Sequence, residues 1–454
     1  MDRWGLGLAS RQTGVSRVPE ARRWLTPGLA LAVVPAAVLF IYIYLFGVNV
    51  VYEDSWNGTL PLVLAFAKGH LTLAMLWAQH NGNRPLLPNL VLTLSDSVTG
   101  VDSKFDMYLG GFCWLVATFL LVRLAARTST ARGLWTVPAA FLLCDLTQVQ
   151  NILWAYQFAW ALTLMCVLVA LTGLEEAVEN RWLFLLAVAA AVVASYSTVQ
   201  GLLIWPVGLT YALLRGVPRV RLWTWVMCGI ATGFVYFWHL GRVFPSTQRT
   251  YPLTHPLQGL QFLLTLMGDL SPGGDLWAGA GLLAGTVVIG WIAYRHKIPA
   301  AALRLPLGLW LFGLLFDLLV TSGRTQLGLG NAYSSRYSTF NLLLGIGLYL
   351  AAVAIFNPSG RWPKIRAQAA SHRLAAGVCA AVVILVLLQL AWSLPFGFKT
   401  GSAYQLERQA GAQALRAYRR EPDGVLAREL YRGGGAYVKS WARIMEARRW
   451  SVFS

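Results

Sequence analysis

Two adjacent carboxylates, Glu53 and Asp54, directly follow the first long apolar stretch of the chain. A carboxylate can act as the general base that takes a proton from a hydroxyl group during group transfer. The apolar stretch, residues 28–50, is long enough to cross a bilayer core, so we expect the pair at the membrane face opposite the N-terminus. Neighbours on a helix point about 100° apart, and we favour Asp54 as the group that faces a site. The alternative is a solvated helix end.

A second polar cluster, residues 80–84 (His-Asn-Gly-Asn-Arg), lies between apolar segments farther along the chain. It contains an imidazole, two amides and a guanidinium, and the planar fork of Arg84 suits a phosphate group. We therefore take His80, Asn81 and Arg84 as candidate substrate ligands. The alternative is a capped turn at the membrane interface.

A third candidate is the glycine-rich loop 322–337, which carries Arg324 and Arg336 near its two ends. Glycines allow a ligand to approach the backbone closely. Positive charge in an outer loop runs against the usual charge distribution of membrane proteins, and binding of a lipid phosphate would explain it. Arg324, Arg336 and the adjacent Tyr337 are therefore candidate donor ligands, although Arg336 can instead reach lipid headgroups.

Amides and aromatic side chains alternate around the turn near residue 150, a combination that suits a carbohydrate. Gln150, Asn151 and Gln157 are the candidate ligands in this segment. An ordinary belt of interfacial aromatic residues would produce the same pattern. Asp317, within an apolar stretch, is a further candidate, either as a functional carboxylate or as the partner of a nearby arginine.

The elements that position these residues are predicted to be membrane-spanning helices. Of the 454 residues, 57% are apolar and 12% are charged, about half the charged share of a soluble domain. We therefore predict an all-α, polytopic transmembrane protein with about eleven spans, and interfacial helices between residues 71 and 100 in the first outer loop. The predicted spans are 28–50, 105–126, 134–147, 152–174, 183–197, 199–214, 222–243, 275–294, 303–321, 337–356 and 374–396.

Charge distribution predicts the orientation. The N-terminal segment and the loops assigned to its side hold nineteen Lys and Arg residues, and the opposite loops hold seven. This difference places the N-terminal segment 1–27 in the cytoplasm and Asp54 outside, in the periplasm or at the exterior of a bacterial inner membrane. The net charge of +18 follows the same rule, so it does not indicate nucleic acid as a partner. Residues 28–396 form the membrane domain, and 397–454 form an amphipathic tail that an odd number of spans places outside.

Other kinds of site find no support in the sequence. It has no phosphate-binding glycine motif, no His-Glu-x-x-His motif and no Gly-x-Ser-x-Gly motif. The five cysteines lie in apolar stretches without metal-ligand spacing. We predict no metal site and no required cofactor, although Glu53, Asp54 and a donor phosphate are able to share a divalent cation.

With an acidic pair after its first span and an arginine-flanked outer loop, the region 28–396 resembles bacterial integral-membrane glycosyltransferases of the GT-C type. The segment 80–84 also resembles the His-Asn-x-His-Arg loop of a set of bacterial membrane proteins, with Asn83 in place of the second histidine. The GT-C resemblance implies a polyprenyl-phosphate sugar donor, Asp54 or Glu53 as general base, and Arg324 and Arg336 as ligands of the donor phosphate. It implies a lipid-linked or cell-envelope glycan as the acceptor.

Two other functions remain open. A glycan polymerase or ligase of the O-antigen type would depend on the outer arginines without an essential carboxylate. A lipid or glycan flippase or transporter often shows inverted repeats and charged residues at the membrane midplane. The sequence shows no internal repeat, and its polar residues concentrate at one face.

Overall fold

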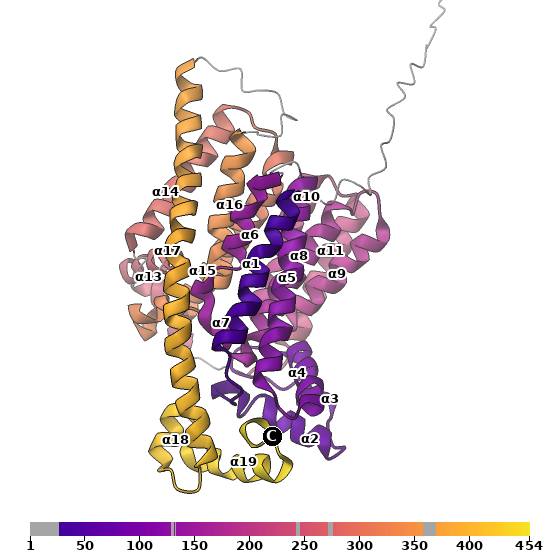
Figure 1. Ribbon diagram of the computed structural model, residues 1–454. Helices are drawn as coiled ribbons and strands as arrows, with labels where there is room; N and C mark the ends of the chain where they lie inside the picture. Colours follow the sequence, from indigo (N-terminus) through magenta and orange to yellow (C-terminus); the bar gives the residue numbers. More distant parts are fainter. Residues whose placement is uncertain (1–26, 129–130, 132, 242–245, 271–275, 357–368) are drawn as a thin grey trace, which may run out of the picture.

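The computed structural model describes residues 27–128, 131, 133–241, 246–270, 276–356 and 369–454, and within them the chain is helical. The only extended pairing there is a single bridge between His80 and Asn83. The prediction of an all-α, polytopic membrane protein is confirmed, and the long helices form one bundle (Figure 1). Residues 1–26 of the expected cytoplasmic segment lie outside the described residues.

Seven helical stretches are long and apolar enough to cross a membrane. They contain α5 (Ser103–Arg127), α8 (Phe158–Glu175), α11 (Arg219–Phe237), α14 (Leu276–Arg295), α15 (Ala300–Arg324), α16 (Ser338–Phe356) and α17 (Ala369–Arg416). Three shorter apolar helices complete the set: α1 (Pro27–Phe46), α9 (Arg181–Ser195) and α10 (Ile204–Arg215). Ten of the eleven predicted spans therefore correspond to apolar helices.

The remaining predicted span, 134–147, is not one helix. It forms a 3-10 turn, the short helix α6 (Val137–Leu143) and the start of a second turn. Asp145 explains the break: its side chain accepts a hydrogen bond from the Thr147 amide, caps the next turn, and accepts another from the Ser393 hydroxyl of α17. Between the predicted spans 222–243 and 275–294 the structure also has two helices outside the prediction, α12 (Ser246–Thr254) and α13 (Pro256–Gly268).

The helices at the centre of the bundle are much more buried within the protein than those at its periphery. In α16, 94% of the apolar stretch is buried within the protein, against 17% in α11. The largest apolar cluster joins α1, α5, α8, α9, α10, α15 and α16. Large apolar side chains of α11, among them Trp223 and Phe234, are exposed, as expected for a helix that faces lipid.

The first outer loop and the C-terminal tail pack together at one end of the bundle. This end carries α2 (Thr59–Ala67), α3 (Leu73–Leu76), α4 (Leu86–Thr99), α18 (Asp423–Glu429) and α19 (Gly435–Arg448) (Figure 1). A separate apolar cluster joins loop residues such as Trp56 and Leu60 to tail residues such as Leu415 and Met445. The predicted tail boundary at residue 397 falls inside α17, which continues through Pro395 to Arg416.

The opposite end is held by ion pairs around Glu175, the last residue of α8. Its carboxylate accepts hydrogen bonds from Arg304 of α15, at 2.5 and 2.8 Å, and from the Tyr211 hydroxyl at 2.8 Å. Arg215 lies 3.4 Å from the same carboxylate, and Arg127 at the end of α5 pairs with Glu176. The loops that contain these residues were assigned to the cytoplasmic side from their Lys and Arg content, and in the structure they lie together at this end.

We predict that Glu175→Ala lowers the free energy of unfolding by about 3 kcal/mol, because it leaves the Arg304 guanidinium, whose side chain is 11% exposed, without its carboxylate partner. The matched control is Glu179→Ala. Its carboxylate is 60% exposed, against 7% for Glu175, and pairs with Arg215 alone, so a change below about 1 kcal/mol is expected. Unfolding in detergent micelles measures both. Equal losses in the two variants would contradict this account of the Glu175 ion pairs.

Candidate functional site

Asp54 lies in a 3-10 turn, Glu53–Ser55, between α1 and α2. The backbone enters this turn through Glu53, whose φ of 42° is in the left-handed region that side chains other than glycine rarely adopt. Such strain persists where surrounding contacts hold it, and it is concentrated at functional sites. The Asp54 side chain is 31% exposed, which leaves its carboxylate accessible.

Contacts with the tail hold the Glu53 conformation. The Glu53 amide donates a 2.8 Å hydrogen bond to the Leu430 carbonyl, and the Glu53 carboxylate lies 3.4 Å from the Arg432 guanidinium. Burial raises the pKa of the Glu53 carboxyl, and the Arg432 charge opposes this rise. Because Glu53 is engaged by the tail while Asp54 is accessible, the geometry favours Asp54 as the reacting carboxylate.

His80 lies beside Asp54, so the structure brings together two residues that the sequence placed in separate clusters. The imidazole Nε2 is 3.3 Å from an Asp54 carboxylate oxygen, and it is buried without a hydrogen bond of good geometry. A tight turn presents the ring: His80 and Asn83 exchange two 3.0 Å backbone hydrogen bonds across Asn81, whose φ is 51°. Asn81 is exposed at the tip of this turn.

Tyr156 adjoins the same pair. Its ring lies 5.1 Å from the His80 ring, centroid to centroid, and its buried hydroxyl has no hydrogen-bond partner. Gly58 permits this approach, because a Cβ atom there would lie 2.6 Å from the Tyr156 ring. In the sequence, Tyr156 is only one of the aromatic residues among the amides near residue 150, since nothing there indicates its contact with the first loop.

Arg84 is engaged by the backbone. Its guanidinium donates to the carbonyls of Tyr236 at 2.8 Å, Trp238 at 2.7 Å and Trp77 at 3.3 Å, and its side chain is buried. These bonds tie the first outer loop to the end of α11. Arg84 therefore has an anchoring role that the sequence did not reveal, and three of its five N–H donors are occupied by carbonyls. Its role as a phosphate ligand stays a prediction.

The loop before α16 supplies Arg336 and Tyr337. The Arg336 guanidinium lies 5.4 Å from the Tyr337 ring, and its buried Nε has no hydrogen-bond partner. Asn151 holds this loop: its side-chain amide donates 2.7 Å hydrogen bonds to the Arg336 carbonyl and the Thr339 hydroxyl. Gln150 contributes through its side-chain oxygen, which accepts a 3.4 Å bond from Ser334. The two amides thus position the arginine loop.

Aromatic contacts connect the Asp54 and Arg336 regions. Tyr156 contacts His80, and Trp160, four residues after it, lies 6.4 Å from the Tyr337 ring. The direction of α15 supports the same placement. This helix runs from Arg304, at the Glu175 end of the bundle, to the loop at the other end that contains Arg336. Asp54 and Arg336 therefore lie at the same end of the bundle.

Two other predicted ligands, Gln157 and Arg324, have fewer contacts with the residues around Asp54 and Arg336. Gln157 is buried at the start of α8, next to Tyr156. Arg324 is half-buried at the last position of α15. In the part of the chain that the structure describes, no group of three or more His, Cys, Asp or Glu residues is arranged to hold a metal ion. A cation shared by Glu53, Asp54 and a donor phosphate stays a prediction.

We predict that Arg84→Lys lowers the free energy of unfolding by about 2 kcal/mol or more, since one ammonium cannot reproduce the fork of hydrogen bonds to three carbonyls. The control is Arg336→Lys. Its guanidinium lacks such bonds, so little change in stability is expected. Thermal unfolding of both variants in detergent measures the difference. Normal stability in Arg84→Lys would contradict the anchoring role.

Comparisons with known proteins give one remote likeness. No protein-family model matches the chain, and no curated protein matches it. Among solved structures, the chain is similar to ArnT from Cupriavidus metallidurans, whose crystal structure was determined bound to undecaprenyl phosphate. The identity is 15%, the TM-score is 0.43, and the match covers 93% of this chain and 88% of ArnT. A likeness at this level assigns no family, and the function proposed below rests on the geometry of the site.

Proposed function

We propose that the protein is a membrane glycosyltransferase that moves a sugar from a polyprenyl-phosphate donor to a lipid-linked or cell-envelope glycan. The observation that carries the proposal is the placement of an accessible carboxylate, Asp54, and a guanidinium with an unpaired buried Nε, Arg336, at one end of a membrane bundle. A base and a phosphate ligand are the two groups that this transfer requires. Aromatic rings between them suit a sugar.

In the proposed reaction, Asp54 takes the proton of the acceptor hydroxyl as its oxygen forms a bond to the anomeric carbon. The bond between that carbon and the phosphate oxygen breaks, and the polyprenyl phosphate leaves with the electron pair. The His80 imidazole lies 3.3 Å from Asp54, within reach of the carboxylate that takes the proton. Inversion at the anomeric carbon follows from a single displacement.

Arg336 has the complementary role. Negative charge collects on the phosphate as the bond to the sugar breaks, and a guanidinium already in position stabilises it without reorganisation. Asn151 holds the Arg336 backbone through a 2.7 Å hydrogen bond, which limits the movement of this loop. We place this chemistry on the extracytoplasmic face of a bacterial inner membrane, as the charge distribution of the sequence predicts.

The first test measures sugar transfer by the purified protein in lipid vesicles, with radiolabelled polyprenyl-phosphate sugars and a lipid-glycan extract. We predict that Asp54→Asn lowers kcat by about 100-fold or more, because an amide cannot accept the proton. The control is Asp423→Asn, a carboxylate of the tail that is 54% exposed and pairs with Lys439, and full activity is expected. Transfer at the normal rate in Asp54→Asn would rule out Asp54 as the general base and would favour the arginine-dependent polymerase or ligase.

Arg336→Ala tests the phosphate ligand in the same assay. We predict a loss of about 100-fold in kcat/KM, the scale of losing one positioned donor to a developing anion. Arg428→Ala, at a tail arginine whose side chain is 73% exposed, is the control and should retain activity. Equal activity in Arg336→Ala and wild type would contradict the assignment. Donor-dependent lipid movement across the vesicle without sugar transfer would favour the flippase or transporter.

A further inference from the structure

Two buried carboxylates that take no part in the proposed reaction lie behind the Asp54 turn. Asp96, near the end of α4, and Asp106, in the first turns of α5, are each 3% exposed. Both belong to the helical hairpin 86–127, whose connecting turn packs against the first outer loop and the tail. Neither carboxylate pairs with a lysine or arginine among the ion pairs of the described residues.

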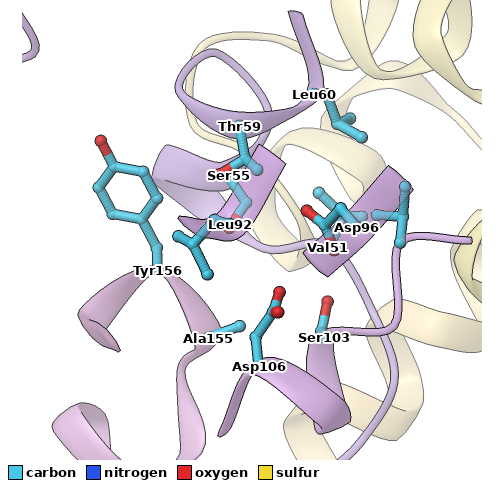
Figure 2. A pocket seen from close by; sticks show the side chains of 11 residues that line it. Val51, Ser55, Thr59, Leu60, Leu92, Asp96, Ser103, Asp106, Ala155 and Tyr156 are labelled. Carbon is cyan, nitrogen blue, oxygen red and sulfur yellow. The ribbon is translucent and has the colours of Figure 1, made fainter. Parts of the chain in front are cut away.

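The two carboxylates line a small cavity together with two serines and a threonine, and Tyr156 also borders it. The cavity measures about 10 Å³, roughly the space of one water molecule. Figure 2 shows Asp96, Asp106 and Ser103 around this space, with Ser55 and Thr59 across from them. Ser55 and Thr59 come from the Asp54 turn and the start of α2, so the cavity joins the hairpin to the segment that carries the candidate base.

The hydrogen bonds leave part of this oxygen cluster without partners. Asp106 accepts a 2.6 Å hydrogen bond from the Ser95 hydroxyl. One carboxylate oxygen of Asp96 is fully buried and has no hydrogen-bond partner. An unpartnered carboxylate oxygen in the interior is costly, so it must gain either a proton or a positive ion.

The electrostatics of the two carboxylates also indicate that they need a proton or a positive ion. Burial, reinforced by the neighbouring Asp106 carboxyl, raises the pKa of Asp96 well above its ordinary value, so the pair resists carrying two negative charges unaided. A divalent cation would neutralise both carboxylates at once. Hard cations such as Ca²⁺, Mg²⁺ and Mn²⁺ prefer oxygen ligands, and serine or threonine hydroxyls serve among them.

We propose that Asp96 and Asp106, with Ser55, Thr59 and Ser103, form a binding site for one hard divalent cation that fixes the Asp54 turn to the α4–α5 hairpin. The ion sits behind the turn, on the side of Ser55, and is separate from any cation that Glu53 and Asp54 share with a donor. The proposal does not depend on the glycosyltransferase function, since its test measures binding.

The test uses the full chain in detergent, stripped with a chelator and titrated with Mn²⁺, Ca²⁺ or Mg²⁺. Equilibrium binding should reach about one ion per chain in wild type, and the ion should raise the thermal unfolding midpoint. Because the cation competes with a proton, the rise should be larger at pH 8 than at pH 6. Asp96→Asn and Asp106→Asn should lose both responses.

Asp102→Asn is the matched control. Asp102 lies in the same turn and caps α5 by accepting from the amides of Lys104 and Phe105, a role that asparagine also performs. This variant should bind the ion like wild type, and Ser103→Ala, which removes one hydroxyl, should bind it at least tenfold more weakly. Absence of binding in wild type, or equal binding in Asp96→Asn, would overturn the proposal and leave a carboxyl pair that shares a proton.

Discussion

The structure depends on the packing of the C-terminal tail against the first outer loop. That loop has little regular structure around Asp54, only one 3-10 turn, and its entry residue Glu53 has a strained backbone. The tail supplies the Leu430 carbonyl, the Arg432 guanidinium and an apolar surface that buries Trp56. A carboxylate that acts as a base must be both accessible and fixed, and these contacts fix the turn while the half-buried Asp54 carboxylate remains accessible.

The two ends of the bundle use charge differently. At one end, Glu175 is fully engaged by Arg304, Tyr211 and Arg215, which is the arrangement of a structural ion-pair network. At the other end, Asp54 has a single imidazole neighbour, and the Arg336 Nε has no partner. Groups that are left incompletely satisfied cost stability, and their retention beside Asp54 and Arg336 is the pattern expected of a site that binds a ligand.

The sequence predicted the class of fold and most of the spans, because long apolar stretches have few alternatives to membrane helices. It predicted Asp54 and His80 separately, but their contact depends on a turn that folds back onto the first loop. For Arg84, two of the three carbonyls that accept its hydrogen bonds lie about 150 residues farther along the chain, so the sequence did not distinguish a structural anchor from a phosphate ligand. The segment Glu407–Arg420 has an amphipathic pattern, and its apolar residues pack on the loop. No sequence prediction covers Asp96 and Asp106, although both are carboxylates within apolar helices.

The most direct test of the account is a cryo-electron microscopy structure of the protein with a polyprenyl-phosphate sugar whose transfer is blocked by Asp54→Asn. The account predicts the donor phosphate within about 3 Å of the Arg336 guanidinium and the anomeric carbon of the sugar facing residue 54. A phosphate bound at the Glu175 end, beside Arg304 or Arg215, would contradict it. So would a sugar held at the Arg336 end with residue 54 turned away from it.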